Sequence, residues 1–182
     1  MNKPTIEELN QYNMEKQLAR CPFPLDKGFY LGKPGNEHYK LLAWFGYQYE
    51  GIQITEIGTL WGGSAMALGH NVKNKVITYD IVEAYGIAKF PYNIEKKIID
   101  PDGAPFNIIC QSDLIFYDAK HEGVEEQQFL DELIKRKWKG ILILDDIHFN
   151  IPMADFWNGI TLRKEDWTDI GHFCGTGIVY FD

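Results

Sequence analysis

Ile-Gln-Ile-Thr-Glu-Ile-Gly-Thr-Leu-Trp-Gly-Gly-Ser, residues 52–64, is the stretch of this sequence that decides the fold. Its first half alternates β-branched residues and predicts a strand. Its second half ends in Gly62 and Gly63, and the helix-forming residues after Ser64 predict the start of a helix. A glycine turn between a strand and a helix lets a ligand approach the backbone, and the helix N-terminus offers N–H groups with partial positive charge. Taken alone, the pattern is equally well explained by a tight turn without a ligand.

The length and composition predict one globular domain. The chain has 182 residues, of which 45% are apolar and 24% charged, as in ordinary soluble proteins. No apolar run approaches the roughly 20 residues that span a membrane, and we expect no signal peptide. The net charge of −8 argues against nucleic-acid binding, which needs clustered Lys and Arg. Cys21, Cys110 and Cys174 form no metal-like pair, so we expect reduced cysteines in a cytoplasmic protein.

Helical and strand patterns alternate along the chain. The expected helices cover residues 5–20, 36–50, 65–70, 94–99, 123–138 and 153–157, with a loop over 21–35 and turns at 71–74 and 101–103. The expected strands cover residues 52–57, 75–82, 106–110, 114–117, 140–144, 167–173 and 177–181. This order predicts a doubly wound, mostly parallel Rossmann-like α/β sheet with a C-terminal antiparallel hairpin. Residues 1–35 are expected to form an N-terminal helix and loop that serve as a candidate lid, and residues 36–182 the main domain. Residues 149–166 are the other candidate lid.

Acidic residues follow the predicted strands. Glu56, Asp80, Asp118 and the pair Asp145 and Asp146 stand at or near strand ends. In an open parallel sheet these ends meet at one crevice, so the five carboxylates are expected to become neighbours. Asp80 lies about 20 residues beyond the glycine turn, the spacing at which a carboxylate binds the two hydroxyls of a ribose. A single Asp at a strand end is more often only a turn or helix cap.

Three of these acids suit a metal ion. Asp118, Asp145 and Asp146 can supply hard oxygen ligands for Mg²⁺, which binds a few carboxylates and keeps several waters. Without a cation, three like charges in one crevice would repel each other. The alternative of equal weight is that Asp146 faces away and caps the next helix.

His121 is the leading candidate for a general base. It follows Asp118 by three residues, and an imidazole that titrates near neutrality can take a proton from a hydroxyl. The equally weighted alternative is a packing or capping role at the start of the next helix. His148 is a weaker candidate, and His38 and His172 are expected to be structural or exposed.

Five aromatic residues can line an apolar pocket for an adenine or an aromatic acceptor. They are Trp61, Tyr117, Phe149, Phe156 and Trp157. Aromatic residues at this density more often belong to the core. The exception is Trp61, because it lies inside the glycine turn.

The motif Glu-x-Gly-x-x-x-Gly-x-Ser over residues 56–64 resembles the first motif of class I S-adenosylmethionine-dependent methyltransferases. It is closest to the catechol O-methyltransferase-like and macrocin O-methyltransferase-like branches, although Leu60 stands where the common form has a glycine. The blocks 116–123, 141–148 and 171–179 are also similar to members of this family. The resemblance covers residues 36–182.

The resemblance implies S-adenosylmethionine as the cofactor. Glu56, Gly58 and Ser64 would face its methionine part, Asp80 its ribose, and residues 111–113 its adenine. The implied cofactor-binding residues are Glu56, Gly58, Thr59, Trp61, Gly62, Gly63, Ser64, Asp80, Ile81, Gln111, Ser112, Asp113 and Asp118.

The resemblance also implies a metal and a base. Asp118, Asp145 and Asp146 match the positions that hold Mg²⁺ in metal-dependent members, and His121 matches a position at which relatives place a catalytic base, often a lysine. The expected function is metal-assisted O-methylation of a small hydroxylated acceptor, with Asp118 and His121 as the catalytic residues. The alternatives are an NAD-dependent oxidoreductase, whose second fingerprint glycine is replaced by Leu60, and a non-catalytic nucleoside-binding module. The acceptor and the oligomeric state stay open.

Overall fold

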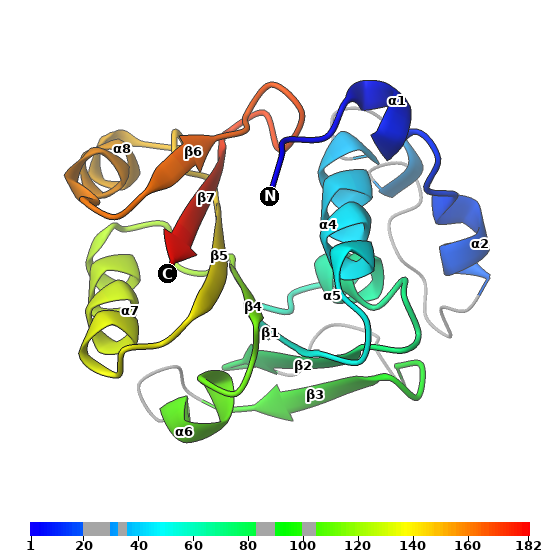
Figure 1. The fold of residues 1–182 in the computed structure, drawn as a ribbon, viewed down its shortest axis with the longest axis horizontal. Helices are drawn as coiled ribbons and strands as arrows, with labels where there is room; N and C mark the ends of the chain where they lie inside the picture. Colours follow the sequence, from blue (N-terminus) through cyan, green and yellow to red (C-terminus); the bar gives the residue numbers. More distant parts are fainter. Residues whose placement is uncertain (20–29, 33–35, 83–89, 100–104) are drawn as a thin grey trace.

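A mixed β-sheet forms the centre of the computed structural model, which describes residues 1–19, 30–32, 36–82, 90–99 and 105–182 (Figure 1). Within these ranges the strand order is β3-β2-β1-β4-β5-β7-β6. The strands are β1 (Gln53–Ile57), β2 (Lys75–Asp80), β3 (Ile94–Ile98), β4 (Leu114–Tyr117), β5 (Gly140–Asp145), β6 (Lys164–Asp166) and β7 (Thr176–Phe181). The first five run parallel, and β7 runs antiparallel to both β5 and β6. The predicted fold class is therefore confirmed.

Helices cover both faces of the sheet (Figure 1). They are α1 (Ile6–Leu9), α2 (Met14–Leu18), α4 (Asn36–Gln48), α5 (Gly63–Leu68), α6 (Phe106–Ile109), α7 (Val124–Lys135) and α8 (Ile151–Gly159). Side chains alternate along the central strands, so that Phe116 and Ile143 pack with residues of α4 and α5, whereas Tyr117 and Leu144 pack with residues of α7 and α8. Burial on both faces explains why these strands are continuously apolar.

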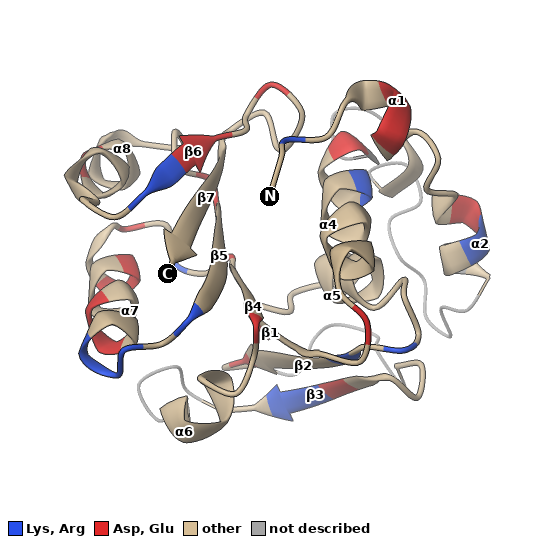
Figure 2. Ribbon diagram, viewed as in Figure 1, with Lys and Arg blue, Asp and Glu red and all other residues tan. Residues whose placement is uncertain are grey.

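The expected strands 52–57, 75–82, 114–117, 140–144 and 177–181 are confirmed as β1, β2, β4, β5 and β7. The expected helix over 123–138 is confirmed as α7, with Glu125 and Glu126 in its first turn and Lys135 in its last (Figure 2). This charge order complements the helix dipole. Other Lys and Arg residues are distributed over separate elements, including β3 and β6 (Figure 2).

Residues 94–98 form the strand β3, and the predicted helix at this position is wrong. Ile94 is buried, while Glu95 pairs with Lys75 of β2 at 2.9 Å and with Lys97 at 3.4 Å. Glu and Lys favour helices in isolation, but pairing with β2 decides the local structure.

Residues 106–109 form the helix α6, and the predicted strand is wrong here. The carbonyl of Pro105 accepts the N–H groups of Ile108 at 2.7 Å and Ile109 at 3.0 Å, which closes a helical turn. Ile109 is fully buried against the α7 face of the sheet. The isoleucines favour a strand by propensity, but tertiary packing overrides this preference.

The predicted strand over 167–173 is also wrong. The Trp167 N–H donates to the carbonyl of Thr176 at 2.8 Å, and the Ile170 N–H donates to the carbonyl of Trp167 at 3.0 Å, so this segment forms turns. The Trp167 ring stacks on Phe45 of α4 with 5.5 Å between the ring centroids. The apolar residues of this segment are therefore buried in turns, and the strand β6 precedes the segment.

The single helix expected over residues 5–20 is divided into α1 and α2. The predicted capping box forms, because the Glu8 N–H donates to the Thr5 hydroxyl at 3.2 Å and the Glu8 carboxylate accepts the Thr5 N–H at 2.7 Å. Asn13 interrupts the helix, because its side chain accepts the Lys16 N–H at 3.0 Å and caps α2.

Two expected segments lie outside the described residues, the turn at 101–103 and the loop at 21–35 apart from residues 30–32. Within the described ranges, every helix is too short or too polar to cross a membrane.

The turn after β1 depends on a close backbone contact. Gly58 has a φ of +95°, and a Cβ atom at this position would lie 1.8 Å from the carbonyl oxygen of Asp118. The Gly58 N–H donates to the carbonyl of Tyr79 at 2.9 Å, and the Asp118 N–H donates to the carbonyl of Ile57 at 2.8 Å. Gly58 therefore lets the ends of β1, β2 and β4 meet.

We expect Gly58→Ala to lower the free energy of unfolding by about 3 kcal/mol, from backbone strain and atomic overlap. Gly51→Ala is the matched control, because Gly51 has a φ of +76° but a Cβ atom at this position would meet no heavy atom within 4 Å. This control is expected to cost about 1 kcal/mol. Urea denaturation measures both values, and equal losses would contradict the overlap at Gly58.

Candidate active site

A cavity of about 260 Å³ opens where the carboxyl ends of β1, β2 and β4 meet. Its lining residues are Gly58, Leu60, Tyr79, Asp80, Ile81, Asp118, Ala119, Lys120 and His121. Five of the residues expected at a site are among them, from three strands and the loops that follow. This is the edge at which open α/β sheets bind ligands.

Asp80 organises the glycine turn. Its Oδ2 atom accepts the N–H groups of Thr59 at 3.0 Å and Leu60 at 2.9 Å, and its Oδ1 atom accepts the N–H of Val82 at 3.1 Å. The carboxylate therefore acts as a turn cap at the edge of the cavity. A carboxylate has about four acceptor positions, so one position is left for a ligand.

Glu56 is a fully buried carboxyl group on the face of the sheet that α4 and α5 cover. Burial raises its pKa to about 8, against the lowering effect of the neighbouring Ser64 and Thr78 hydroxyls. The side chain is therefore protonated at neutral pH in the protein alone. It lies beneath the glycine turn rather than among the residues that line the cavity.

The rest of the glycine turn combines buried and exposed groups. Thr59 is buried and its hydroxyl lies 2.6 Å from the Thr78 hydroxyl. Trp61 is 49% exposed, so the expectation that it lies outside the core is confirmed. Gly62 has a φ of +74° and precedes α5, which begins with the buried residues Gly63 and Ser64.

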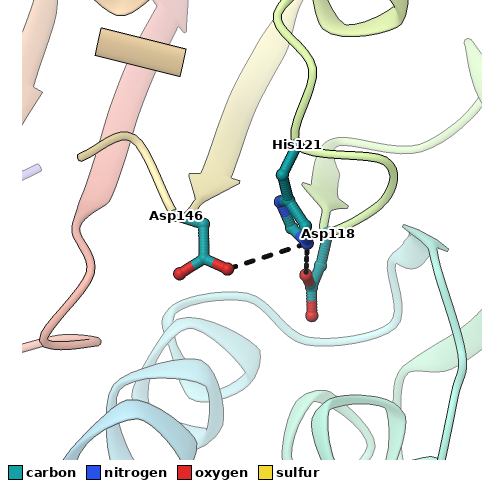
Figure 3. A group of neighbouring side chains, drawn as sticks. All are labelled: Asp118, His121 and Asp146. Carbon is teal, nitrogen blue, oxygen red and sulfur yellow. Dashed lines mark ion pairs between the residues drawn. The ribbon is translucent and has the colours of Figure 1, made fainter. Parts of the chain in front are cut away.

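Asp118, His121 and Asp146 form an outer cluster beside the cavity (Figure 3). His121 Nε2 lies 3.4 Å from Asp118 Oδ1 and 3.6 Å from Asp146 Oδ2. Two hydrogen bonds hold the His121 backbone, because Glu126 accepts the His121 N–H at 2.8 Å and Asn150 donates to the His121 carbonyl at 2.7 Å. His121 and Asp146 have φ values of 59° and 57°, which is backbone strain of the kind found at functional sites.

An inner cluster consists of His38, Asp145, Asp146 and His172. His172 Nδ1 lies 2.9 Å from Asp146 Oδ1 and 3.4 Å from Asp145 Oδ1, and His38 Nδ1 lies 3.9 Å from Asp145 Oδ1. The expectation that these two histidines are structural or exposed missed this contact with the acids. The sequence does contain a signal for this contact, because His172 precedes the last strand, β7, by a few residues. The start of an antiparallel strand lies beside the end of its neighbour, so His172 is brought close to Asp145 at the end of β5.

The two clusters perturb each other's ionisation. Burial and the carboxylates of Asp145 and Asp146 raise the pKa of Asp118 well above its usual range. Burial alone would lower the pKa of His172, but the same two carboxylates raise it to about 10. Burial lowers the pKa of His38. For Asp145 the nearby His38 and His172 rings outweigh burial and lower the pKa.

The expected metal triad of Asp118, Asp145 and Asp146 is divided between these clusters. Asp146 belongs to both, with Oδ2 toward His121 and Oδ1 toward His172. Asp145 turns toward the two histidines of the inner cluster and does not share a ligand set with Asp118. The alternative that Asp146 faces away and only caps a helix is wrong, because Asn150 caps α8.

Gln111, Ser112 and Asp113 do not reach the cavity. They precede β4, whereas the cavity adjoins the other end of that strand. The Ser112 hydroxyl is buried and lies 2.8 Å from the Thr55 hydroxyl, and Gln53 donates to it at 3.0 Å. We therefore leave these three residues out of the candidate site.

The remaining candidates divide by exposure. His148 is exposed, with Nε2 2.7 Å from Asp166 Oδ2 of β6, and it belongs to neither cluster. Tyr117, Phe156 and Trp157 belong to the core on the α7 face of the sheet, the position that the high density of aromatic residues in the sequence favours. Phe149 is 56% exposed, and its ring lies 5.7 Å from the His121 ring.

A second cavity, of about 530 Å³, lies between α2, the end of α4 and the turn after α5. Lys16, Tyr47, His70 and Lys73 are among its lining residues. None of the expected site residues lines this cavity, so its larger volume does not make it the candidate active site.

No protein-family model matches this sequence, and no curated protein matches it. Solved structures do match. They include an S-adenosylhomocysteine-bound methyltransferase of Podospora anserina, at 16% identity over 100% of this chain and 99% of that chain, with a TM-score of 0.55. Cofactor-bound Rv0187 from MTB matches at 16% identity over 99% of both chains, with a TM-score of 0.62. The O-methyltransferase of Bacillus cereus in complex with S-adenosylhomocysteine matches at 16% identity over 97% of this chain and 90% of that chain, with a TM-score of 0.53.

The chain has the fold of S-adenosylmethionine-dependent O-methyltransferases. The resemblance seen in the sequence therefore holds for the fold. In this methyltransferase fold, the cavity at the ends of β1, β2 and β4 is the candidate active site.

The buried Glu56 predicts how stability depends on pH. The folded protein keeps this proton up to about pH 8, whereas the unfolded chain releases it near the ordinary value of 4.5. The Glu56 contribution to stability is therefore full below pH 4.5 and falls as pH rises toward 8, by up to about 1.4 kcal/mol per pH unit. Urea denaturation of the ligand-free protein between pH 5 and 8 measures the slope. Glu56→Gln is expected to flatten it, and identical slopes for both proteins would contradict the assignment.

Proposed function

We propose that this protein transfers the methyl group of S-adenosylmethionine to a hydroxyl oxygen of a small acceptor. The observation that carries the proposal is the cavity of the methyltransferase fold, which brings Gly58, Asp80 and Asp118 together with a histidine, His121. These residues come from three different strands or the loops that follow them. A glycine turn that binds no ligand would not require side chains from three strands to meet at one cavity.

The cofactor would lie across the glycine turn. Asp80 has an acceptor position left for a ribose hydroxyl after it has capped the turn. Both carboxyl oxygens of Glu56 are buried without a hydrogen bond of good geometry, and an ammonium group such as that of a methionine part would supply donors. The exposed Trp61 and Ile81 flank this region and offer apolar surface for the cofactor. The fit rests on these groups, and residues 111–113 take no part in it.

His121 is the proposed base. Its Nε2 atom stands between two carboxylates, which orient the ring and stabilise the imidazolium that forms after proton transfer. The acceptor oxygen loses its proton to Nε2 and bonds to the methyl carbon as the carbon–sulfur bond breaks, so the products are the methyl ether and S-adenosylhomocysteine. Alignment of the oxygen with the methyl group is the main resource for such a transfer.

The outer cluster also fits Mg²⁺. Burial and the neighbouring carboxylates raise the pKa of Asp118, and a cation would relieve the repulsion between these carboxylates. Asp118 and Asp146 are the residues that would hold the ion, whereas Asp145 faces the inner cluster. A bound divalent ion would polarise the acceptor oxygen and favour its deprotonation.

Phe149 suggests the character of the acceptor. It is exposed beside the His121 ring and presents an aromatic face next to the proposed base. A phenolic acceptor could stack on this ring while its hydroxyl approaches His121. We therefore propose aromatic hydroxyl compounds as the first acceptors to screen.

Calorimetric titration with S-adenosylmethionine, S-adenosylhomocysteine and NADH tests the cofactor. We expect one equivalent of each of the first two ligands to bind and NADH not to bind. Binding of NADH alone would support the oxidoreductase alternative. Binding of the two adenosyl ligands without turnover of any acceptor would support a non-catalytic module.

His121→Gln tests the base. We expect kcat to fall by about 10²–10⁴-fold, while the affinity for S-adenosylhomocysteine changes little, because the residue acts on the acceptor proton. His148→Gln is the matched control, since His148 is an exposed histidine that pairs with Asp166 outside the cavity. Steady-state kinetics and calorimetry provide the two readouts. An unchanged kcat for His121→Gln would reject this role.

A further inference from the structure

The second cavity lies at the opposite end of the sheet from the candidate active site. Glu50 and Lys73, which line it, stand just before the parallel strands β1 and β2, whereas Gly58 and Ile81 of the first cavity stand just after these strands. Its volume of about 530 Å³ lies within the range of small-molecule sites in proteins, roughly 300–1,000 Å³. The second cavity is therefore separate from the proposed cofactor site and large enough for a ligand of its own.

Hydrogen bonds hold the walls of this cavity in place. Asn71 and Asn74 each donate from Nδ2 to the carbonyl groups of Gly46 and Tyr49, at distances between 2.6 and 3.3 Å, and so join the end of α4 to the turn after α5. Gln17 of α2 is buried and donates to a backbone carbonyl of α5. The helices α2, α4 and α5 lie together beside the sheet (Figure 1). Since these bonds connect the three helices, the cavity is formed without a ligand.

Tyr47 gives the cavity an aromatic wall. It is 46% exposed, and its ring lies 5.3 Å from the Tyr12 ring and 5.5 Å from the His70 ring. The Tyr47 hydroxyl lies 3.2 Å from His70 Nδ1, which fixes the orientation of the Tyr47 ring. Val72 is also exposed and adds apolar surface. An exposed aromatic ring held in one orientation suits a flat aromatic ligand.

The charged groups of the lining favour an anion. They are Lys16, Lys73 and Glu50. Lys73 forms an ion pair with Glu50, whereas the Lys16 ammonium has no carboxylate partner among the residues that the structure describes. The carbonyl groups at the end of α4 already accept hydrogen bonds from Asn71 and Asn74, so they do not attract a cation. A negatively charged group beside Lys16 would complete the charge balance of this wall.

We propose that the second cavity binds a small aromatic carboxylate, with its ring against Tyr47 and its carboxylate at Lys16. The apolar surface of Tyr47 and Val72 contributes affinity for the ring, and the Lys16 ammonium selects the negative charge. The site uses no residue of the candidate active site, so it does not depend on the proposed methyl transfer.

Calorimetric titration of the full chain with naphthoate tests the site. We expect Lys16→Gln to weaken binding about fivefold, since Lys16 is exposed and its ion pair is partly screened, and Tyr47→Ala to weaken it about tenfold. Lys139→Gln is the matched control for the charge, because Lys139 is an exposed lysine that does not line the cavity. Phe149→Ala is the matched control for the ring, because Phe149 is an exposed aromatic residue beside the proposed base. Both controls are expected to bind naphthoate as the wild type does.

A second ligand supplies a readout that does not depend on the variants. Naphthylmethylamine has the same ring system with a positive charge, and we expect the wild-type chain to bind it at least about tenfold more weakly than naphthoate. Equal affinity for the two ligands would overturn the role of Lys16, and so would the absence of naphthoate binding at millimolar concentration. Loss of binding in Phe149→Ala but not in Tyr47→Ala would also overturn the proposal, because the ligand would then occupy the candidate active site.

Discussion

The mutual repulsion of three carboxylates dominates this edge of the sheet. Asp118, Asp145 and Asp146 stand at the ends of adjacent strands, and Asp145 and Asp146 are buried, where charges are poorly screened. Burial and this crowding together raise the pKa of Asp118, and the carboxylates of Asp145 and Asp146 raise the pKa of His172 to about 10 against the effect of burial. Three histidine rings accompany the acids. His121 lies on one side of them, and His38 and His172 lie on the other.

The strand order produces this arrangement. β4 lies beside β5, so Asp118 comes next to the pair at the end of β5. β7 is antiparallel to β5 and places Thr176 opposite Asp145, which brings the preceding segment with His172 to the same edge. On the other side of β4, Gly58 permits contact with the Asp118 backbone. The C-terminal strand thus places His172 beside the candidate active site.

Several groups at the same edge of the sheet lower the free energy of unfolding. Glu56 is buried as a carboxyl group, and His121 and Asp146 occupy the left-handed region of backbone conformation. Groups of this kind destabilise a fold by a few kcal/mol and persist where the surrounding structure holds them. Around His121, Asn150 donates to the His121 carbonyl and Glu126 accepts the His121 N–H. The proposed cofactor would supply donors to the buried Glu56 carboxyl group, which the protein alone leaves unsatisfied.

The sequence by itself determined the parts of the structure that depend on local pattern. The alternation in 52–57, the apolar run of 140–144 and the amphipathic segment 123–138 predict β1, β5 and α7, and strand ends marked by acids predict one acidic edge. Only the tertiary structure decided which groups complete that edge. β3 and α6 took forms opposite to their propensities because their neighbours in space set their pairing and burial. His38 lies more than a hundred residues from Asp145, and its contact with that acid follows from how α4 packs on the sheet, which short-range sequence patterns do not encode.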